Sequence, residues 1–186
     1  VSIECNTNDE VKTLTESIQQ MAQNLKAYVK EINGLVYRDG LTGVKNKTYY
    51  YEYIKSLSEE AQKQPYTIVV FKVTGLAGVN KTRGRKCGDE LIVTACGIIC
   101  RVFSHSPIFR IGGDEFVAFL KGNDYMKCGE LLREFEDLSS DVTLVGAPDI
   151  AVRIVYGMAQ SADGTEPYEE VFCRADEEKD QKKKGM

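Results

Sequence analysis

The most chemically suggestive stretch of the chain is a run of two glycines and two carboxylates, Gly112-Gly113-Asp114-Glu115, here called the hairpin tip. It separates two short apolar segments, residues 107–111 and 116–120, and so predicts the turn of a β-hairpin, where glycines supply positive φ angles. Glycines also let a ligand come close to the backbone. Two carboxylates offer the oxygen ligands that a hard cation such as Mg²⁺ prefers. Taken alone, the pattern favours the more common outcome, which is a solvated acidic turn.

Apolar segments around the hairpin tip predict the elements that must position it. A β-branched run over residues 66–73 predicts a central strand, and alternating residues predict another strand over 150–158. Apolar residues at helical spacing predict helices over residues 49–57, 91–103 and 125–138. A glycine-punctuated stretch, residues 75–88, follows the central strand, and Pro167 opens a last, very polar helix. This order of elements predicts an α/β domain with helices on the faces of a sheet.

A heptad stripe precedes this domain. Branched residues occupy its a positions and mostly unbranched residues its d positions, which favours a parallel two-stranded coiled coil. The a positions are Val11, Ile18, Leu25 and Ile32, and the d positions are Leu14, Met21, Tyr28 and Leu35. We therefore expect a homodimer joined through this helix. The alternative is a single helix packed on its own domain.

Length and composition limit the class of protein. The 186 residues suit one domain with a helical appendage, and 42% apolar and 28% charged residues give a soluble globular balance. A net charge of −4 argues against nucleic acid as a partner. No stretch approaches the roughly 20 apolar residues that span a bilayer. Because the chain begins at Val1 rather than Met, we expect it to be a fragment of a longer protein. A membrane span in the missing upstream part is compatible with this sequence.

The cysteines and the histidine predict no metal centre. None of the six cysteines forms a CxxC pair, and the single histidine, His105, lies in a loop-like Ser-His-Ser-Pro sequence. Cys96 and Cys100 are one helical turn apart in an apolar run, which favours two buried thiols in a reducing compartment.

Residues 110–116, Arg-Ile-Gly-Gly-Asp-Glu-Phe, resemble the signature of the GGDEF family, the diguanylate cyclase domain. Further stretches agree in order along residues 39–185. They are residues 39–47, which resemble the family's opening DxLTGLxNR, Asn80 with Asp89 nine residues later, the strand Tyr156-Gly157-Met158-Ala159, and Arg174-Ala175-Asp176 with Lys183 and Gly185. The helix over residues 1–36 resembles the end of a HAMP linker, which leaves residues 37–186 as the GGDEF domain.

This resemblance implies a nucleotidyl cyclase fold like the polymerase palm, with a central, mostly antiparallel sheet flanked by helices. It implies condensation of two GTP to cyclic di-GMP with Mg²⁺, one GTP on each of two subunits. It also implies the cytoplasmic domain of a bacterial inner-membrane protein, behind an upstream transmembrane sensor. The residues it assigns are the catalytic carboxylates Asp114 and Glu115, the metal ligands Asp114 and the Val73 backbone, and the nucleotide-binding residues Asn80, Asp89, Gly112, Gly113 and Lys183.

The chain departs from the family pattern in the metal loop. Lys72 stands where the family has a metal-binding aspartate, Thr74 replaces a second aspartate, and Ala77 replaces a lysine that contacts phosphates. A lysine at the end of a buried strand needs a partner, so we expect Lys72 to form an ion pair with Asp114 or Glu115. These changes predict a degenerate domain that binds guanine nucleotide with weak or no cyclase activity. The alternatives are an active cyclase and a structural coiled-coil domain without ligand.

Two further departures lie outside that loop. The family's inhibitory RxxD motif is absent, since Phe103 and Ser106 stand at its two ends, so product feedback is not expected. The apolar ALY of the last helix is replaced by Glu178-Lys179-Asp180. Because two apolar anchors are lost, we expect this helix to be frayed or displaced.

Overall fold

The structure, a computed structural model, describes residues 13–25, 36–59 and 63–184. The chain divides into two units, residues 1–38 and 39–186. Residues 13–25 form a helix on which four heptad residues are more than half exposed, namely Leu14, Ile18, Met21 and Leu25. The other four heptad residues lie outside the described residues. No helix in the described part of the chain is long and apolar enough to cross a bilayer.

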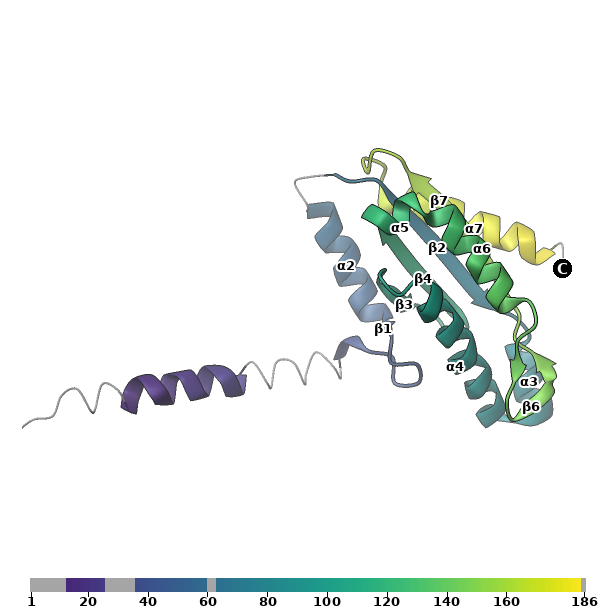
Figure 1. The fold of residues 1–186 in the computed structure, drawn as a ribbon, viewed down its shortest axis with the longest axis horizontal. Coiled ribbons are helices and arrows are strands. Elements are labelled where there is room, and N and C mark those ends of the chain that lie inside the picture. The colour runs from purple at the N-terminus through teal and green to yellow at the C-terminus, as the bar shows by residue number, and fades with distance from the viewer. Residues whose placement is uncertain (1–12, 26–35, 60–62, 185–186) are drawn as a thin grey trace, which may run out of the picture. The chain divides into compact units, whose positions relative to one another are not determined.

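A five-stranded sheet of order β1-β3-β4-β2-β7 forms the second unit (Figure 1). Its central strand β2 (Tyr66–Val73) runs antiparallel to β4 (Glu115–Lys121) on one side and to β7 (Ile154–Ser161) on the other. β3 (Ile108–Arg110) is antiparallel to β4, and β1 (Lys45–Asn46) is parallel to β3. The predicted mostly antiparallel sheet is confirmed, and so is the hairpin around residues 112–115.

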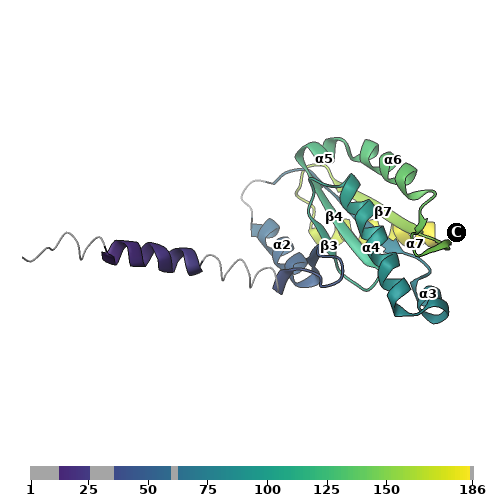
Figure 2. The same cartoon turned by 60° about the horizontal axis from the view of Figure 1, so that its bottom comes forward.

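Helices cover both faces of this sheet. Successive side chains of β2 point to opposite faces, and because they are apolar on both, each face needs a covering layer. Val69, Phe71 and Val73 face one core with α4 (Arg85–Val102) and α6 (Cys128–Ser139). Tyr66, Ile68 and Val70 face a second core with α2 (Lys47–Glu59) and α7 (Tyr168–Lys184). Figure 2 shows α4 and α6 on one side of the strands and α7 on the other. The face on which a β2 residue lies therefore decides which helix its side chain meets.

Two sequence predictions need correction, and a stretch for which the sequence predicted no element forms a helix. The glycine-punctuated stretch contains a helix, α3 (Leu76–Arg83), which lies between Gly75 and Gly84, both at positive φ. The helix predicted over 125–138 is two helices, α5 (Gly122–Met126) and α6, with Lys127 between them. The strand predicted over 150–158 is also two: β6 (Ala147–Ala151) pairs with β5 (Thr143–Leu144) in a separate sheet, and β7 begins afterwards. A hydrogen bond from Val152 N to Val142 O (2.8 Å) holds the chain between the two strands.

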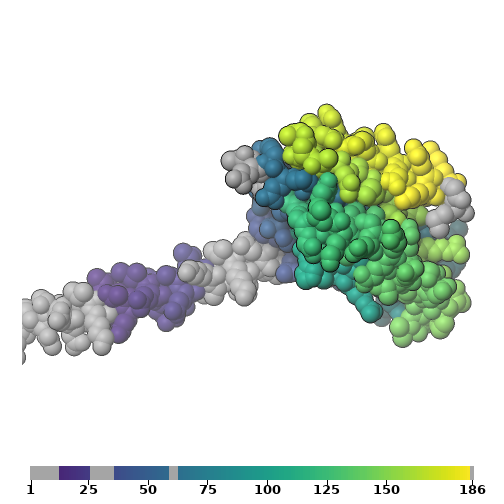
Figure 3. All heavy atoms as spheres, turned by 45° about the horizontal axis from the view of Figure 1, so that its top comes forward, coloured from purple at the N-terminus to yellow at the C-terminus, as the bar shows by residue number. Residues whose placement is uncertain are grey.

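The last helix is neither frayed nor displaced, contrary to expectation. α7 is continuous from Tyr168 to Lys184 and buries Val171, Ala175 and Lys179 along one stripe. It lies against β7 so closely that a Cβ atom on Gly157 would come 2.1 Å from the Ala175 oxygen. Figure 3 shows α7, in yellow, along one side of the domain surface. A charged residue, Lys179, takes the place of the missing apolar anchor.

Candidate functional site

The candidate site is built on a cross-strand pair. Lys72 lies directly opposite Glu115 in the register of β2 and β4. Lys72 follows Ile68 and Val70 on the face of β2 that α7 covers, and Glu115 precedes Val117 on the same face. Both charged side chains are therefore placed beneath the C-terminal half of α7, at the end of the sheet where the hairpin tip lies.

The predicted ion pair of Lys72 with the hairpin tip is confirmed. Lys72 Nζ is 2.9 Å from Glu115 Oε1 and 3.6 Å from Asp114 Oδ1. The three side chains are 21–31% exposed, so water screens the pair only in part. One lysine thus faces both carboxylates of the tip.

A second lysine, Lys179 of α7, reaches the same carboxylate. Its Nζ is 3.4 Å from Glu115 Oε1 and 3.7 Å from Asp180 Oδ1, and it also pairs with Asp176. The side chain is only 3% exposed. The sequence interpretation treated this position as a lost apolar anchor and missed its contact. The spacing along the helix could have predicted its burial, because Lys179 follows Val171 and Ala175 at intervals of four residues, about one helical turn, on the same face.

The pKa values of these groups follow from their contacts. Burial acts to lower the pKa of Lys72, but the hydrogen bond and charge of Glu115, with the charge of Asp114, outweigh it and raise this pKa. Burial likewise opposes the raised pKa of Lys179, which Asp176 and Glu115 bring about. Burial acts to raise the pKa of Glu115, yet the two lysines hold it below its usual value. All three groups are therefore charged over the physiological range.

Backbone hydrogen bonds fix the hairpin tip. Val73 N donates to Asp114 O (2.8 Å), and Ile111 N donates to Glu115 O (3.0 Å). The expectation that the tip's glycines adopt positive φ is wrong, since neither Gly112 nor Gly113 is among the glycines with positive φ. A Cβ atom on Gly112 would instead come 3.3 Å from Glu115 Oε2. Glycine here leaves room for the Glu115 side chain.

Arg110 connects the hairpin tip to the start of the domain. Its Nη2 donates to Gly113 O (2.6 Å), and its Nη1 pairs with Asp39 Oδ1 (2.8 Å). Asp39 also accepts hydrogen bonds from the N–H (2.9 Å) and hydroxyl (2.7 Å) of Thr42, which close the turn before β1. Burial opposes the lowering of the Asp39 pKa, but these hydrogen bonds and Arg110 prevail.

The structure brings the two predicted guanine-binding residues into neighbouring positions. Asn80 lies on α3 and Asp89 on α4, and both are exposed. The Asn80 amide rests against Gly88, where an added Cβ atom would come 2.0 Å from its Oδ1. Lys183, the predicted phosphate contact, is exposed in the last turn of α7. The lysine of α7 that reaches the hairpin tip is Lys179, one turn earlier.

The residues at the hairpin tip do not fit the Mg²⁺ that the resemblance implies. The ammonium of Lys72 lies 3.6 Å from Asp114 Oδ1, the expected ligand atom. Two like unit charges 4 Å apart repel by about 4 kcal/mol at an effective dielectric constant of 20, and a dication doubles this. Among the residues that the structure describes, no group of three or more His, Cys, Asp or Glu side chains is arranged to hold a metal ion. The tip accommodates ammonium groups in place of a divalent cation.

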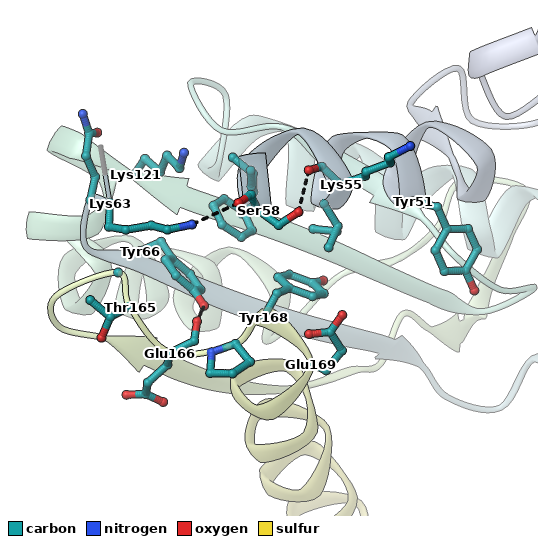
Figure 4. A pocket seen from close by; sticks show the side chains of 16 residues that line it. Tyr51, Lys55, Ser58, Lys63, Tyr66, Lys121, Thr165, Glu166, Tyr168 and Glu169 are labelled. Atoms are coloured by element: carbon teal, nitrogen blue, oxygen red, sulfur yellow. Dashed lines mark hydrogen bonds between the residues drawn. The ribbon is translucent and has the colours of Figure 1, made fainter. Parts of the chain in front are cut away.

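A hollow of about 510 Å³ lies at the other end of β2 (Figure 4). Tyr66 stacks on Phe119 with ring centroids 4.9 Å apart, and Tyr168 lines the same hollow. Lys63 Nζ donates to Ser58 O (3.3 Å) near the C-terminal end of α2, as the dashed line shows. None of the predicted site residues lines this hollow. It is separate from the hairpin tip.

Comparisons with known proteins agree with this arrangement. A family model described as "Diguanylate cyclase, GGDEF domain" matches residues 36–186. The "Probable diguanylate cyclase DgcC" of Escherichia coli K12 is 26% identical over 161 residues, which cover 84% of this chain and 43% of the relative. "Diguanylate cyclase DgcS" of Shewanella oneidensis is 35% identical over 88 residues, 46% of this chain and 30% of the relative. The chain spans less than half the length of these two relatives.

A solved structure shares the fold. It is the coiled coil and GGDEF domain of DgcB from Caulobacter crescentus in complex with c-di-GMP, with a TM-score of 0.77. The match covers 94% of this chain and 95% of that chain at 21% identity. The architecture of strands and helices described above is therefore that of this class of domain.

Proposed function

The chain belongs to the GGDEF family of diguanylate cyclase domains, and we propose that it is a degenerate member that binds guanine nucleotide but makes cyclic di-GMP weakly or not at all. The observation that carries this proposal is the position of Lys72. Its ammonium lies 2.9 Å from Glu115 and 3.6 Å from Asp114, where the family resemblance calls for a metal carboxylate. Chemistry of this class depends on metal ions that neutralise charge and activate the attacking oxygen. A lysine supplies charge but cannot act as that Lewis acid.

Binding of guanine nucleotide is supported by α3 and α4. The Asn80 amide offers both a donor and an acceptor, and Asp89 accepts hydrogen bonds, which together complement the edge of a guanine base. Asn80 rests against Gly88, the residue before Asp89, and both side chains are exposed to solvent. An exposed ion pair between Arg83 of α3 and Asp149 of β6, 2.5 Å apart, joins α3 to β6 at the surface.

A second candidate, an active diguanylate cyclase, is favoured by the intact hairpin tip. Asp114 and Glu115 are both present, and Arg110 and Val73 hold the backbone around them. Such activity would require Lys72 to leave the carboxylates when a metal–nucleotide complex arrives. The two candidates differ in a directly measurable property, the rate of product formation.

The wider role that we propose is signalling output. The exposed stripe of Leu14, Ile18, Met21 and Leu25 supports association of two chains through the helix over residues 13–25. The DgcB fragment that matches this chain itself contains a coiled coil and a GGDEF domain. We further propose a HAMP-like linker in this segment, a transmembrane sensor upstream and a cytoplasmic location at the bacterial inner membrane. Guanine nucleotide is the proposed ligand, and nucleic acid is not a proposed partner.

The experiment combines a binding and an activity measurement on the same preparation. Calorimetric titration should show that GTP binds more tightly than ATP, because Asn80 and Asp89 complement guanine. Chromatography after incubation with GTP and Mg²⁺ should show cyclic di-GMP formation far below about 1 per second. Turnover near that rate would establish the active cyclase instead. Absence of GTP binding would leave only a structural role.

A further inference from the structure

Two lysine amines meet one carboxylate oxygen at the hairpin tip. Nζ of Lys72 is 2.9 Å, and Nζ of Lys179 is 3.4 Å, from Oε1 of Glu115. Lys72 is also 3.6 Å from Oδ1 of Asp114. Each carboxylate of the tip thus has an ammonium group of the chain itself beside it. A divalent cation added here would be repelled by the ammonium groups that already contact these carboxylates.

Lys179 is closed off from any incoming ligand. Its side chain is 3% exposed, it donates hydrogen bonds to Glu115 and Asp176, and Asp180 Oδ1 lies 3.7 Å from its Nζ. Its own backbone is fixed as well, because a Cβ atom on Gly157 of β7 would come 2.3 Å from Lys179 N. The close packing of α7 on β7 therefore keeps Lys179 buried beside Glu115.

Lys72 is more open than Lys179. Its side chain is 21% exposed, and it has two carboxylate partners, Glu115 and Asp114. An ammonium group with two such partners keeps one N–H donor for a further acceptor. The group that Lys72 is suited to receive from solvent is therefore an anion, such as a phosphate oxygen, and not a cation.

From these contacts we propose that the site takes guanine nucleotide as the metal-free anion. Lys72 is the counter-ion that receives a phosphate oxygen. Lys179 is a positioning residue, which holds Glu115 neutralised and keeps it from a divalent cation. The part concerning nucleotide rests on the proposed function, whereas the exclusion of a divalent cation stands on the two lysines alone.

Titration with Mn²⁺ alone, followed by the paramagnetic resonance signal of the free ion, tests the exclusion without nucleotide. A double variant, Lys72→Asp with Lys179→Leu, removes both amines and adds a carboxylate. It should bind Mn²⁺ at least about tenfold more tightly than the unchanged chain. A Lys127→Ala variant, between α5 and α6, should behave like the unchanged chain. If the unchanged chain binds Mn²⁺ as tightly as the double variant, the exclusion is overturned.

Calorimetric titration with GTP, in EDTA and then in Mg²⁺, tests the metal-free binding. The unchanged chain should bind at least as tightly in EDTA as in Mg²⁺. Lys72→Met should weaken binding in EDTA by about tenfold or more, the loss of one charge-assisted hydrogen bond, while Lys72→Arg should retain most of it. Binding that appears only with Mg²⁺ would overturn this inference and leave the proposed function intact. Binding in neither buffer would remove the proposed function, and Mn²⁺ titration would still decide the exclusion.

A thermal unfolding curve for each variant separates lost binding from lost folding. Lys72→Arg keeps the charge and the position of the counter-ion, so it reports on the site even if Lys72→Met is unstable. If Lys72→Arg folds normally but loses binding in EDTA to the same extent as Lys72→Met, a cation at this position is not sufficient. That result would also overturn the role given to Lys72.

Discussion

Lys72 and Glu115 stand directly opposite each other on β2 and β4, and their charged ends are 2.9 Å apart. Opposite charges on facing positions of neighbouring strands stabilise a sheet, whereas like charges there destabilise it. A carboxylate at position 72 would repel Glu115 unless a cation bound between them. With lysine at this position, Glu115 has an opposite charge of the chain itself facing it across the two strands.

The first prediction concerns recovery of activity. Lys72→Asp alone should raise cyclic di-GMP synthesis only in part, because Thr74 and Ala77 also differ from the family pattern. Addition of Thr74→Asp and Ala77→Lys should raise it further. The measurement is product formed from GTP and Mg²⁺ for each variant, with Lys127→Ala as the control. Full activity from Lys72→Asp alone would show that Thr74 and Ala77 do not limit the reaction.

Much of this fold follows from local patterns in the sequence. The β-branched run of β2 was predicted with its observed bounds, Tyr66–Val73, because strand propensity and burial act together there. The hairpin around Gly112–Glu115 was predicted from its short turn between two apolar segments. The predicted partner of Lys72 was found for a similar reason, since a charge at the end of a buried strand has few alternatives to pairing.

The remainder depends on contacts that no local pattern reveals. α3 has no buried residues, so it lacks the apolar periodicity that predicts a helix. Lys179 was misjudged because a charged residue is normally read as solvent-facing. Its burial depends on Glu115, 64 residues away in the sequence. The break between β6 and β7 depends likewise on pairing with the separate strand β5.

Removal of the Lys179 amine should destabilise the domain. Lys179→Ala leaves Glu115 and Asp176 less neutralised and creates a cavity under α7. Loss of one partner of a fully buried ion pair costs about 3–5 kcal/mol, but these carboxylates are 30% and 38% exposed. We therefore expect the free energy of unfolding, measured in urea, to fall by about 2 kcal/mol. Lys179→Met should lose less, because it keeps a long side chain in the core.

Lys183→Ala is the control for that measurement. Lys183 is on the same helix but is exposed, so its removal should change the free energy of unfolding by less than about 0.5 kcal/mol. If Lys179→Ala and Lys183→Ala are equally mild, the buried amine of Lys179 does not stabilise α7.

Stability should depend on pH through Glu115. Its pKa in the folded chain lies below the ordinary value of 4.5, so ionised Glu115 favours folding. This contribution is complete above pH 4.5 and is lost as the pH falls through the lowered pKa. The raised pKa values of Lys72 and Lys179 act at the other extreme, where stability is lost as the pH rises above 10.5. Glu115→Gln should therefore be less stable than the unchanged chain at pH 7, and the difference should shrink in acid.

Urea unfolding of both proteins between about pH 7 and pH 3 measures this dependence. A difference between Glu115→Gln and the unchanged chain that stays constant over the range would mean that ionisation of Glu115 is not coupled to folding.

The helix over residues 13–25 should join two chains. Its four apolar heptad residues are 58–70% exposed, and burial of such a stripe against a second copy favours association. Sedimentation velocity at micromolar concentration should show a dimer. Ile18→Gln with Leu25→Gln keeps helix propensity but makes the stripe polar, and should give a monomer. Gln19→Ala, beside the stripe, should remain dimeric. A monomeric unchanged chain would contradict the prediction.

The close packing of β7 against α7 gives the last prediction. A Cβ atom at position 157 would come 2.1 Å from Ala175 O and 2.3 Å from Lys179 N, both backbone atoms that cannot rotate away. Gly157→Ala should therefore lower the free energy of unfolding by at least about 2 kcal/mol. Gly97→Ala, in α4 with nothing within 4 Å of the added atom, should instead raise it by up to about 1 kcal/mol.

Because Gly157→Ala displaces the backbone that carries Lys179, it should already weaken the contact of Lys179 with Glu115. A double variant of Gly157→Ala and Lys179→Ala should then lose less stability than the two single losses added together. Strictly additive losses would mean that α7 can shift on β7 without disturbing the hairpin tip.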